Sequence, residues 1–378
     1  LTIQFNSEQE MSFFLHSKMK KPTMKNMSLL CCFLFAMTAT TAQWTKKLTL
    51  PASETFSFIS AVDDNVVWGF TNIKQIYIST NAGNKWRKII PAGIATNTSS
   101  KAFYAVTASM ALLAVSTDLT GIGPGIIYLT QDTGNTWVPV FTHAGNCEFN
   151  IAMYNAKTGL MTCSFDSFNG SVKAGQQLRK TTNGGKTWTS DNSTDPSDDS
   201  RLLCLQVSGK NAWLADGSKI YNSSDGGFTW VKQGMPKKRT YYNNLQIVSN
   251  DYAVINEGSL INIYAKRPGS LLWNDLGDPT GFSGALTCML LDSSECWFAT
   301  PFDLLQNFYS HDSAKTFTAV QVDNNGAFNV LTKSRNGRNF WGAVSFSRTL
   351  WMLDRNAEKF VCKPQNKPEI AAKWKTVR

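Results

Sequence analysis

The sequence predicts an all-β protein: a single seven-bladed β-propeller of four-stranded antiparallel blades with a repeated hairpin, spanning residues 43–363. Three observations carry this prediction. An octet ending in an aromatic residue recurs along the chain, its spacing is nearly constant, and several short strand-like runs precede each copy. No sustained helical periodicity follows the first 42 residues.

The octet is clearest as TTNGGKTW at 181–188 and SSDGGFTW at 223–230. STNAGNKW at 79–86 and TQDTGNTW at 130–137 are further good copies, and SHDSAKTF at 310–317 is a weaker one. The gap before the last copy is double, and a decayed copy, KRPGSLLW, ends at Trp273 inside it. Another decayed copy, LDRNAEKF, ends at Phe360, so the chain divides into seven units of 42 to 51 residues.

Each unit is expected to contain four short strands. In the first unit the runs are FSFISAV, NVVWGF and QIYIS before the octet, and WRKII from its closing aromatic onward. Runs of β-branched and aromatic residues bounded by Gly, Asn, Asp and Ser are typical of strands joined by tight turns. Four such strands in each period of 40 to 50 residues predict a propeller blade.

The octet itself is interpreted as the hairpin between the third and fourth strands. Its first Ser or Thr and its third Asp or Asn can bond the backbone of their own turn. Glycine at the fifth position accepts a positive φ, and the closing aromatic fills space between blades. The residues assigned to this structural role are Ser79, Asn81, Gly83, Trp86, Thr130, Asp132, Gly134, Trp137, Thr181, Asn183, Gly185, Trp188, Ser223, Asp225, Gly227, Trp230, Ser310, Asp312 and Phe317.

Two segments compete for the outer strand of the last blade. Trp44, in QWTKKLTL, aligns with the aromatics that begin the other fourth strands, so the N-terminal segment is one candidate. Lys359–Cys362 follows the last decayed octet and is the other candidate. The sequence does not distinguish between them.

Residues 1–42 are expected to be an upstream artefact followed by a secretory signal peptide. Lys20, Lys21 and Lys25 precede the apolar run MSLLCCFLFAM, and small residues lead to Gln43. The run is too short for a membrane span, so we expect an exported protein, periplasmic or extracellular, with residues 364–378 as a tail. Removal of four Lys and two Glu changes the charge from +10 to +8, as 33 basic minus 25 acidic residues.

Six cysteines follow the signal segment. Cys147 with Cys163, and Cys288 with Cys296, each bracket a strand–turn–strand stretch and are candidate disulfides in an oxidising compartment. The alternative is that they are buried thiols. With no CxxC motif and only three His in the chain, we expect no metal site and no cofactor.

The octets resemble the Asp-box, or bacterial neuraminidase, repeat S/T-x-D/N-x-G-x-x-W over roughly residues 43–363. Proteins with this repeat include sialidases, xyloglucanases, sortilin-type receptors and a photosystem II assembly factor. The signal peptide running into QWTKK also resembles exported propellers of Bacteroidetes-type bacteria. The resemblance implies that the octet hairpins face away from the functional centre, which would lie on the loops between second and third strands and between blades.

A sialidase would need an arginine triad, a Tyr–Glu nucleophile pair and an F/Y-R-I-P motif. The nearest string, WRKIIP at 86–91, follows an octet and is in the wrong place. Another glycoside hydrolase would need two carboxylates facing one sugar, for which Asp275, Asp278 and Asp303 are conceivable but unmarked by any spacing. We therefore expect a binding or assembly module, with a glycoside hydrolase as the alternative.

The expected partner is an acidic glycan, peptide or protein surface, and not nucleic acid or a membrane span, and the protein is expected to be a monomer. The loop GMPKKRTYYN joins cations to tyrosines, although it could equally be a solvated turn. DNSTDPSDDS at 191–200 could bind calcium through its aspartates or be an ordinary surface loop. The candidate ligand-binding residues are Lys237, Lys238, Arg239, Tyr241 and Tyr242 in the first loop, and Phe168, Lys173, Phe302 and Arg348 over the channel.

Overall fold

The computed structural model describes the chain from residue 44 to residue 354, with gaps. In the described residues every regular element is a strand. None of them forms a helix long and apolar enough to cross a membrane. The described residues are 44–121, 123–164, 178–190, 202–216, 219–234, 242–249, 252–257, 263–266, 272–277, 287–290, 295–300, 306–312, 316–322 and 326–354.

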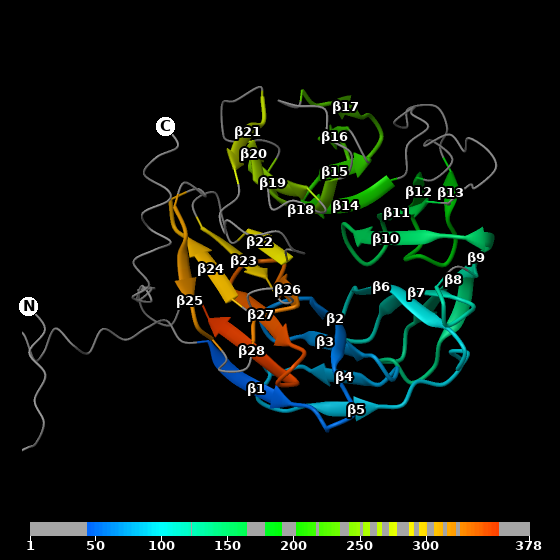
Figure 1. Ribbon diagram of the computed structural model, residues 1–378. Helices are drawn as coiled ribbons and strands as arrows, with labels where there is room; N and C mark the ends of the chain where they lie inside the picture. The colour runs from blue at the N-terminus through cyan, green and yellow to red at the C-terminus, as the bar shows by residue number, and fades with distance from the viewer. Residues whose placement is uncertain are drawn as a thin grey trace, which may run out of the picture. The chain divides into compact units, whose positions relative to one another are not determined.

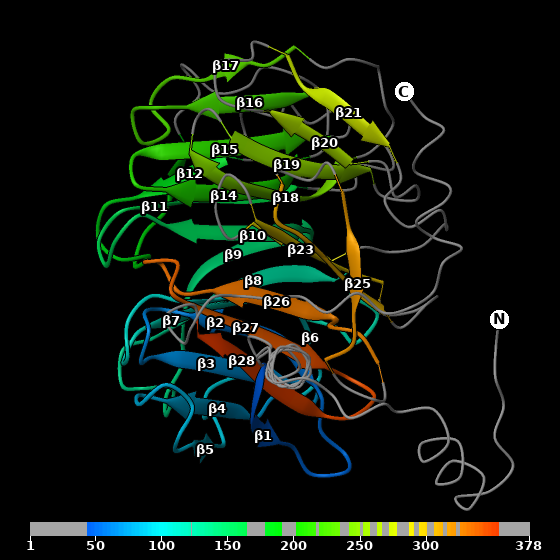
Figure 2. The same cartoon turned by 90° about the vertical axis from the view of Figure 1, so that its left-hand side faces the viewer.

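Six sheets each consist of four antiparallel strands that follow one another along the chain, and Figures 1 and 2 show them as separate layers of arrows. Each is ordered from its first strand to its fourth, as expected for a propeller blade. The first three are β2 (Phe56–Ala61), β3 (Val67–Thr71), β4 (Ile76–Ser79) and β5 (Arg87–Ile89); β6 (Ser99–Ala105), β7 (Ala111–Ser116), β8 (Pro124–Thr130) and β9 (Val138–Asn146); and β10 (Glu148–Met153), β11 (Gly159–Ser164), β12 (Leu178–Thr181) and β13 (Thr189–Ser190).

The other three sheets of consecutive strands repeat the same order. Their bounds are β14 (Leu202–Ser208), β15 (Asn211–Asp216), β16 (Ile220–Ser223) and β17 (Val231–Lys232); β18 (Tyr242–Ser249), β19 (Tyr252–Glu257), β20 (Ile263–Lys266) and β21 (Asn274–Gly277); and β22 (Thr287–Leu290), β23 (Cys296–Thr300), β24 (Gln306–Ser310) and β25 (Thr318–Val320).

One further sheet is composite, because it joins the two ends of the described chain. Its strands are β26 (Val330–Lys333), β27 (Asn339–Val344) and β28 (Thr349–Asp354), with β1 (Thr45–Thr49) as the outer strand. β1 runs antiparallel to β28, with Thr45 opposite Met352 and Thr49 opposite Thr349. Of the two segments that compete for this position in the sequence, the N-terminal one occupies it, and Lys359–Cys362 lies outside the described residues.

The prediction of seven blades, each with an octet hairpin, was therefore wrong. Six blades, not seven, are built from four consecutive strands, and only in these is the fourth strand reached through the third-to-fourth hairpin. The composite sheet has no such hairpin, since its outer strand lies at the other end of the sequence. The count of octet-like strings did not predict the composite sheet. A decayed string such as LDRNAEKF does not indicate whether a paired fourth strand follows it.

The first strands of neighbouring sheets contact one another in chain order, from β2 to β6 and onward to β26. β26 also contacts β2, so the circuit of first strands is closed. The second strands pack against the neighbouring sheets. Every residue of the second strands β3, β7 and β27 is buried. The core is therefore a series of layers between sheets, as a propeller requires.

Tryptophans on the second strands form much of this core. Trp68, Trp213, Trp297 and Trp341 are all fully buried. Closing aromatics pack edge-on against three of them, each from another sheet: Trp86 on Trp341 at 6.1 Å between ring centroids, Trp273 on Trp213 at 5.7 Å, and Trp44 on Trp297 at 5.4 Å. Trp44 thus replaces the closing tryptophan of an octet in the composite sheet, which explains its alignment with those residues.

Candidate functional site

The strand order divides the loops between two faces. Turns from first to second strands share one face with the octet turns, which we call the octet face. Backbone hydrogen bonds join the two kinds of turn within a sheet, from Ala82 N to Asn65 O at 3.0 Å and from Gly184 N to Lys157 O at 2.7 Å. Loops from second to third strands and the connections between sheets lie at the other ends of the strands, on what we call the connection face.

The octet turns repeat one hydrogen-bond pattern. The hydroxyl of the first residue accepts from the backbone N of the fifth, at 2.8 Å for Ser79 and Gly83 and at 3.0 Å for Thr130 and Gly134. The side chain of the third residue accepts from the backbone N of the seventh, as Asp225 does from Thr229 at 2.9 Å. The same two contacts occur at 181–187, and Asp312 accepts from Thr316 N in the weaker copy.

The two aspartates of the clearest acidic turns have lowered pKa values. For Asp132, hydrogen bonds from the Thr136 side chain and backbone lower the pKa. For Asp225, burial alone would raise the pKa, but hydrogen bonds from Thr229, Ser223 and Phe228 outweigh it and lower the pKa to about 2. These carboxylates are fully used in holding their own turns, which makes them poor candidates for proton transfer at neutral pH.

Glycine at the fifth octet position allows close packing between sheets. Gly83 and Gly134 have φ of 74° and 83°, and a Cβ on Gly83 would lie 2.7 Å from Cη2 of Trp341. The fourth position is also left-handed, including at the non-glycine residues Ala82 (56°) and Thr133 (65°), which the sequence pattern did not predict. The octet residues therefore hold turns and pack sheets together.

The connection face presents exposed apolar side chains on three neighbouring sheets. Ile73, Leu119 and Phe346 each lie in a loop from a second to a third strand, and their exposed fractions are 44, 74 and 66%. The three sheets adjoin, because β2 contacts both β6 and β26. Sequence reasoning missed these residues, although each is a single apolar residue in a polar loop: TNIKQ, TDLTG and SFSRT.

Basic groups accompany these side chains. Arg348 is half-buried at φ 57° and closes the Ser345–Arg348 turn through its backbone N, 3.1 Å from Ser345 O. Lys74 donates through Nζ to Ala95 O at 3.1 Å and also to Thr96 O, which ties its loop to the connection between sheets. Burial lowers the pKa of Lys74.

The acidic side chains described at this face of the three sheets are engaged nearby. Glu54 is only 2% exposed and lies 2.5 Å from Lys88 Nζ, and Glu148 lies 2.5 Å from Lys101 Nζ. Asp118 Oδ1 accepts from Gly121 N at 2.7 Å within its own loop. Two of these carboxylates are paired with lysines, and Asp118, Lys74 and Arg348 carry the other charges described here.

Most of the candidate ligand-binding residues lie outside the described part of the chain. This holds for Lys237, Lys238, Arg239 and Tyr241, and for Phe168, Lys173 and Phe302. Tyr242 begins β18, where the structure describes its backbone only. Arg348 is the member of the set that the structure places fully, on the connection face beside Phe346. Asp278 and Asp303 are likewise outside the described residues, and Asp275 lies in β21.

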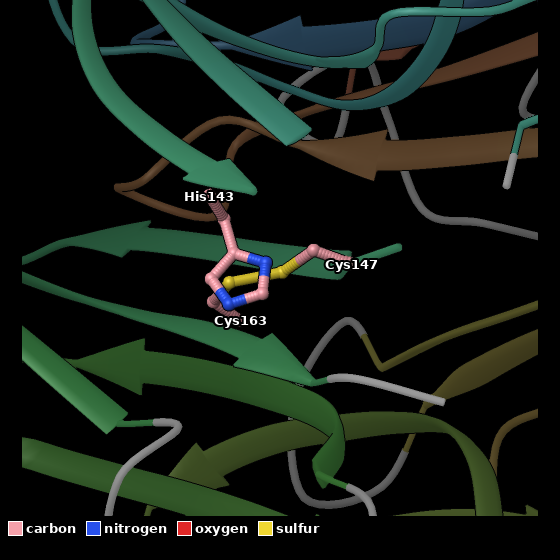
Figure 3. A group of neighbouring side chains, drawn as sticks. All are labelled: His143, Cys147 and Cys163. Carbon is pink, nitrogen blue, oxygen red and sulfur yellow. A yellow bond between two sulfur atoms is a disulfide. The ribbon is translucent and has the colours of Figure 1, made fainter. Parts of the chain in front are cut away.

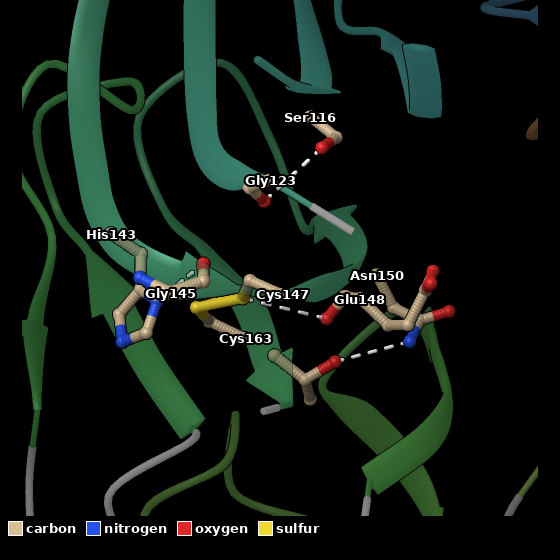
Figure 4. Close-up of a disulfide and its surroundings, with 9 residues drawn as sticks. Ser116, Gly123, His143, Gly145, Cys147, Glu148, Asn150 and Cys163 are labelled. Carbon is tan, nitrogen blue, oxygen red and sulfur yellow. Dashed lines mark hydrogen bonds between the residues drawn. A yellow bond between two sulfur atoms is a disulfide. The ribbon is translucent and has the colours of Figure 1, made fainter. Parts of the chain in front are cut away.

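Cys147 and Cys163 are joined by a disulfide, with 5.5 Å between their Cα atoms (Figure 4). Cys147 lies between β9 and β10, and Cys163 on β11 is opposite Phe149, two residues beyond Cys147. The candidate pair Cys288 and Cys296 has a similar strand register, because Cys288 lies opposite Phe298, two residues beyond Cys296. Cys296 is buried, and the side chain of Cys288 is outside the described part of the structure.

His143, three residues before the end of β9, completes a group of possible metal ligands with this pair (Figure 3). One ligand atom from each of His143, Cys147 and Cys163 lies within 4.8 Å of the others. The histidine is half-buried, whereas the sulfurs belong to residues that are at most 1% exposed. This group could not be recognised in the sequence, because its members come from two blades and do not form a CxxC motif.

No protein-family model and no curated protein matches this chain. Among solved structures, "YCF48 bound to D1 peptide" is 15% identical with a TM-score of 0.57, over 82% of this chain and 94% of that one. A GH74 xyloglucanase from Xanthomonas campestris is 10% identical with a TM-score of 0.60, over 82% of this chain and 53% of that one. The WD40 β-propeller domain of Doa1 is 10% identical with a TM-score of 0.55, over 82% and 97%. At these identities the likeness establishes a β-propeller fold and nothing finer.

Proposed function

We propose that this protein is a non-catalytic, exported recognition propeller that binds an acidic peptide or protein surface on its connection face. The observation that carries the proposal is the set of exposed apolar side chains Ile73, Leu119 and Phe346 on three neighbouring sheets. Single exposed apolar residues are ordinary, but their occurrence on the same kind of loop in adjoining blades favours a binding surface.

The basic net charge of the chain favours an acidic partner. The chain carries a net +10, or +8 once residues 1–42 are removed, and Arg348 follows Phe346 by two residues on this face. A guanidinium beside an apolar anchor suits a peptide carboxylate next to an apolar residue. Lys237, Lys238 and Arg239 would extend the same recognition between blades, as the sequence suggests. An acidic glycan is the alternative ligand, and it would depend on the charges more than on the apolar side chains.

The comparisons support this function only in outline. Propellers of similar fold include one solved with a bound peptide and a WD40 domain, and also a glycoside hydrolase. Membership of the Asp-box class is part of the proposal, supported by the repeated hydroxyl-to-glycine and carboxylate-to-backbone contacts of the octet turns. Export is also part of it, and rests on the apolar run at residues 27–37 after a basic segment.

The magnitude indicates weak affinity. Full burial of one such side chain contributes about 1.5–3 kcal/mol, and three together about 4–8 kcal/mol when Ile73 is discounted for its partial burial. Association itself costs about 4–15 kcal/mol, so the apolar contacts alone give weak binding. Charged contacts would strengthen it and make the affinity fall as salt rises.

The test is a peptide array that runs from strongly acidic to strongly basic sequences, with and without a Leu or Phe. We expect selective binding of acidic peptides that contain an apolar residue. Phe346→Ser should weaken this binding about tenfold, equal to about 1.4 kcal/mol. The matched control is Phe228→Ser, a phenylalanine of the octet face with a similar exposed fraction, 63% against 66%.

Equal effects of Phe346→Ser and Phe228→Ser, or no preference for acidic peptides, would contradict the proposal. Glycan and fluorogenic glycoside panels on the same protein separate the alternatives. Binding of anionic glycans in place of peptides would identify a lectin. Turnover that disappears on mutating Asp275, Asp278 or Asp303 would identify a hydrolase instead.

A further inference from the structure

We propose that reduction of the Cys147–Cys163 disulfide creates a zinc site, in which both thiolates and His143 bind one Zn²⁺ ion. The three ligands are assembled across two blades: His143 lies within β9 of one sheet, Cys147 precedes β10 of the next, and Cys163 lies on β11 (Figure 3). Two thiolates with one imidazole form a ligand set that zinc proteins use when a fourth position is left for water or substrate. This inference is independent of the peptide-binding function.

The distances allow the change of state. A tetrahedral zinc ion with Zn–S bonds of about 2.3 Å and a Zn–N bond of about 2.0 Å separates its sulfurs by about 3.8 Å and each sulfur from nitrogen by about 3.5 Å. The ligand atoms already lie within 4.8 Å of one another. Once the S–S bond is broken, side-chain rotation can supply the remaining movement, because the 5.5 Å between the Cα atoms suits both states.

The surroundings of His143 favour ligation. Nδ1 lies 3.1 Å from the carbonyl oxygen of Gly145. The tautomer that carries its proton on Nδ1 donates to this carbonyl and presents Nε2 as the metal-binding nitrogen, the arrangement commonly found behind zinc-bound histidines. The backbone N of Gly145 is also 3.1 Å from Nδ1, and it favours the other tautomer when no metal is bound.

The half-buried position of His143 gives the ion a route to the two buried sulfurs. Figure 4 shows the imidazole on one side of the disulfide, with Glu148 and Asn150 on the other side. Among the described residues, Glu148 follows Cys147 directly, and its carboxylate is paired with Lys101 at 2.5 Å. We therefore assign the fourth coordination position to water.

The reaction balances with an external thiol as the reductant. Two thiols R–SH reduce the S–S bond to two cysteine thiols and leave as R–S–S–R. Zn²⁺ then displaces the proton of each thiol, so that two protons are released for each ion bound. The oxidised chain holds a disulfide and no thiolate, and therefore binds no zinc at this position.

The experiment titrates Zn²⁺ into the full chain after reduction and removal of the reductant, against a chromogenic chelator, with released protons measured by an indicator dye. We expect one Zn²⁺ and two protons per reduced chain, and none for the oxidised chain. Co²⁺ in place of Zn²⁺ should give thiolate charge-transfer absorption and intense visible bands of tetrahedral coordination. His143→Ala should weaken zinc binding about 100-fold, while His311→Ala, outside the group, should leave it unchanged.

Several results would overturn the assignment. They are the absence of stoichiometric zinc in the reduced chain, equal binding by the oxidised chain, and equal binding by His143→Ala. Alkylation of the folded, reduced chain tests the two cysteines without substituting them. Alkylation counted by mass spectrometry at Cys147 and Cys163 must abolish binding, and zinc retained after it would also refute the site.

Discussion

Gly83→Ala tests the inter-sheet role of the octet turns. Gly83 is the fifth residue of its octet, with φ at 74°, and its Cβ would lie 2.7 Å from Cη2 of Trp341 and 3.2 Å from Cβ of Lys47. Trp341 is fully buried on the second strand of the composite sheet, so its ring has little freedom to move. Gly337 offers a matched control, because its φ is 72° and its Cβ would meet nothing within 4 Å.

Both substitutions place an alanine in a left-handed conformation, but only Gly83→Ala also brings a Cβ too close to Trp341. A left-handed conformation costs an alanine about 1–2 kcal/mol, and the loss of unfolded-state freedom offsets about 0.4–1 kcal/mol. Gly337→Ala should therefore lower the free energy of unfolding by about 0–1.5 kcal/mol. Gly83→Ala adds overpacking against Trp341, about 1–3 kcal/mol, and should be the less stable variant by that amount.

The assay is urea unfolding of both variants and the parent chain, followed by tryptophan fluorescence at one pH and temperature. The expected result is a lower midpoint for Gly83→Ala at an unchanged dependence on urea. Equal free energies of unfolding for the two variants would refute the reasoning, since only the strain that they share would then matter.

Two further predictions concern the octet turns. Thr133→Gly should raise the free energy of unfolding by about 0–1.5 kcal/mol in urea unfolding, because Thr133 occupies φ 65° and glycine removes that strain while gaining freedom in the unfolded chain; a destabilised variant would contradict this. Asp225→Asn keeps a side-chain oxygen that can accept the same hydrogen bond, as Asn183 does in its octet. The substitution therefore tests what the negative charge contributes to stability. Because hydrogen bonds lower the pKa of Asp225 to about 2, its stabilisation is complete above about pH 4 and is lost as pH falls toward 2. The variant should be about 1 kcal/mol less stable at pH 6, allowing for solvent screening, and equal to the parent near pH 2, whereas a constant difference in urea unfolding would contradict the assignment.

The repeated part of the fold could be predicted because its physics is local. A Ser or Thr at the first octet position, Asp or Asn at the third and Gly at the fifth satisfy one turn, so each clear copy marks a hairpin by itself. The outer strand of the composite sheet could not be assigned in this way. β1 and β28 are some 300 residues apart in the sequence. The residues around Trp44 and Phe360 carry no local pattern that identifies their partner strand.

The candidate sites depended even more on contacts that are distant in sequence. Trp68, Trp213, Trp297 and Trp341 recur on second strands, and that periodicity was a usable signal for the partners of the closing aromatics. Ile73, Leu119 and Phe346 gain meaning only when the order of the sheets places their loops on one face. His143 reaches the Cys147–Cys163 pair only because β9 extends over nine residues.

The claim that recognition belongs to the connection face is tested most directly by hydrogen–deuterium exchange with and without the acidic peptide that binds best on the array. The bound peptide should slow backbone exchange in the loops around Ile73, Leu119 and Phe346. Exchange in the octet turns at 79–86, 130–137, 181–188 and 223–230 should not change. Protection of the octet turns, with the three loops unchanged, would contradict it.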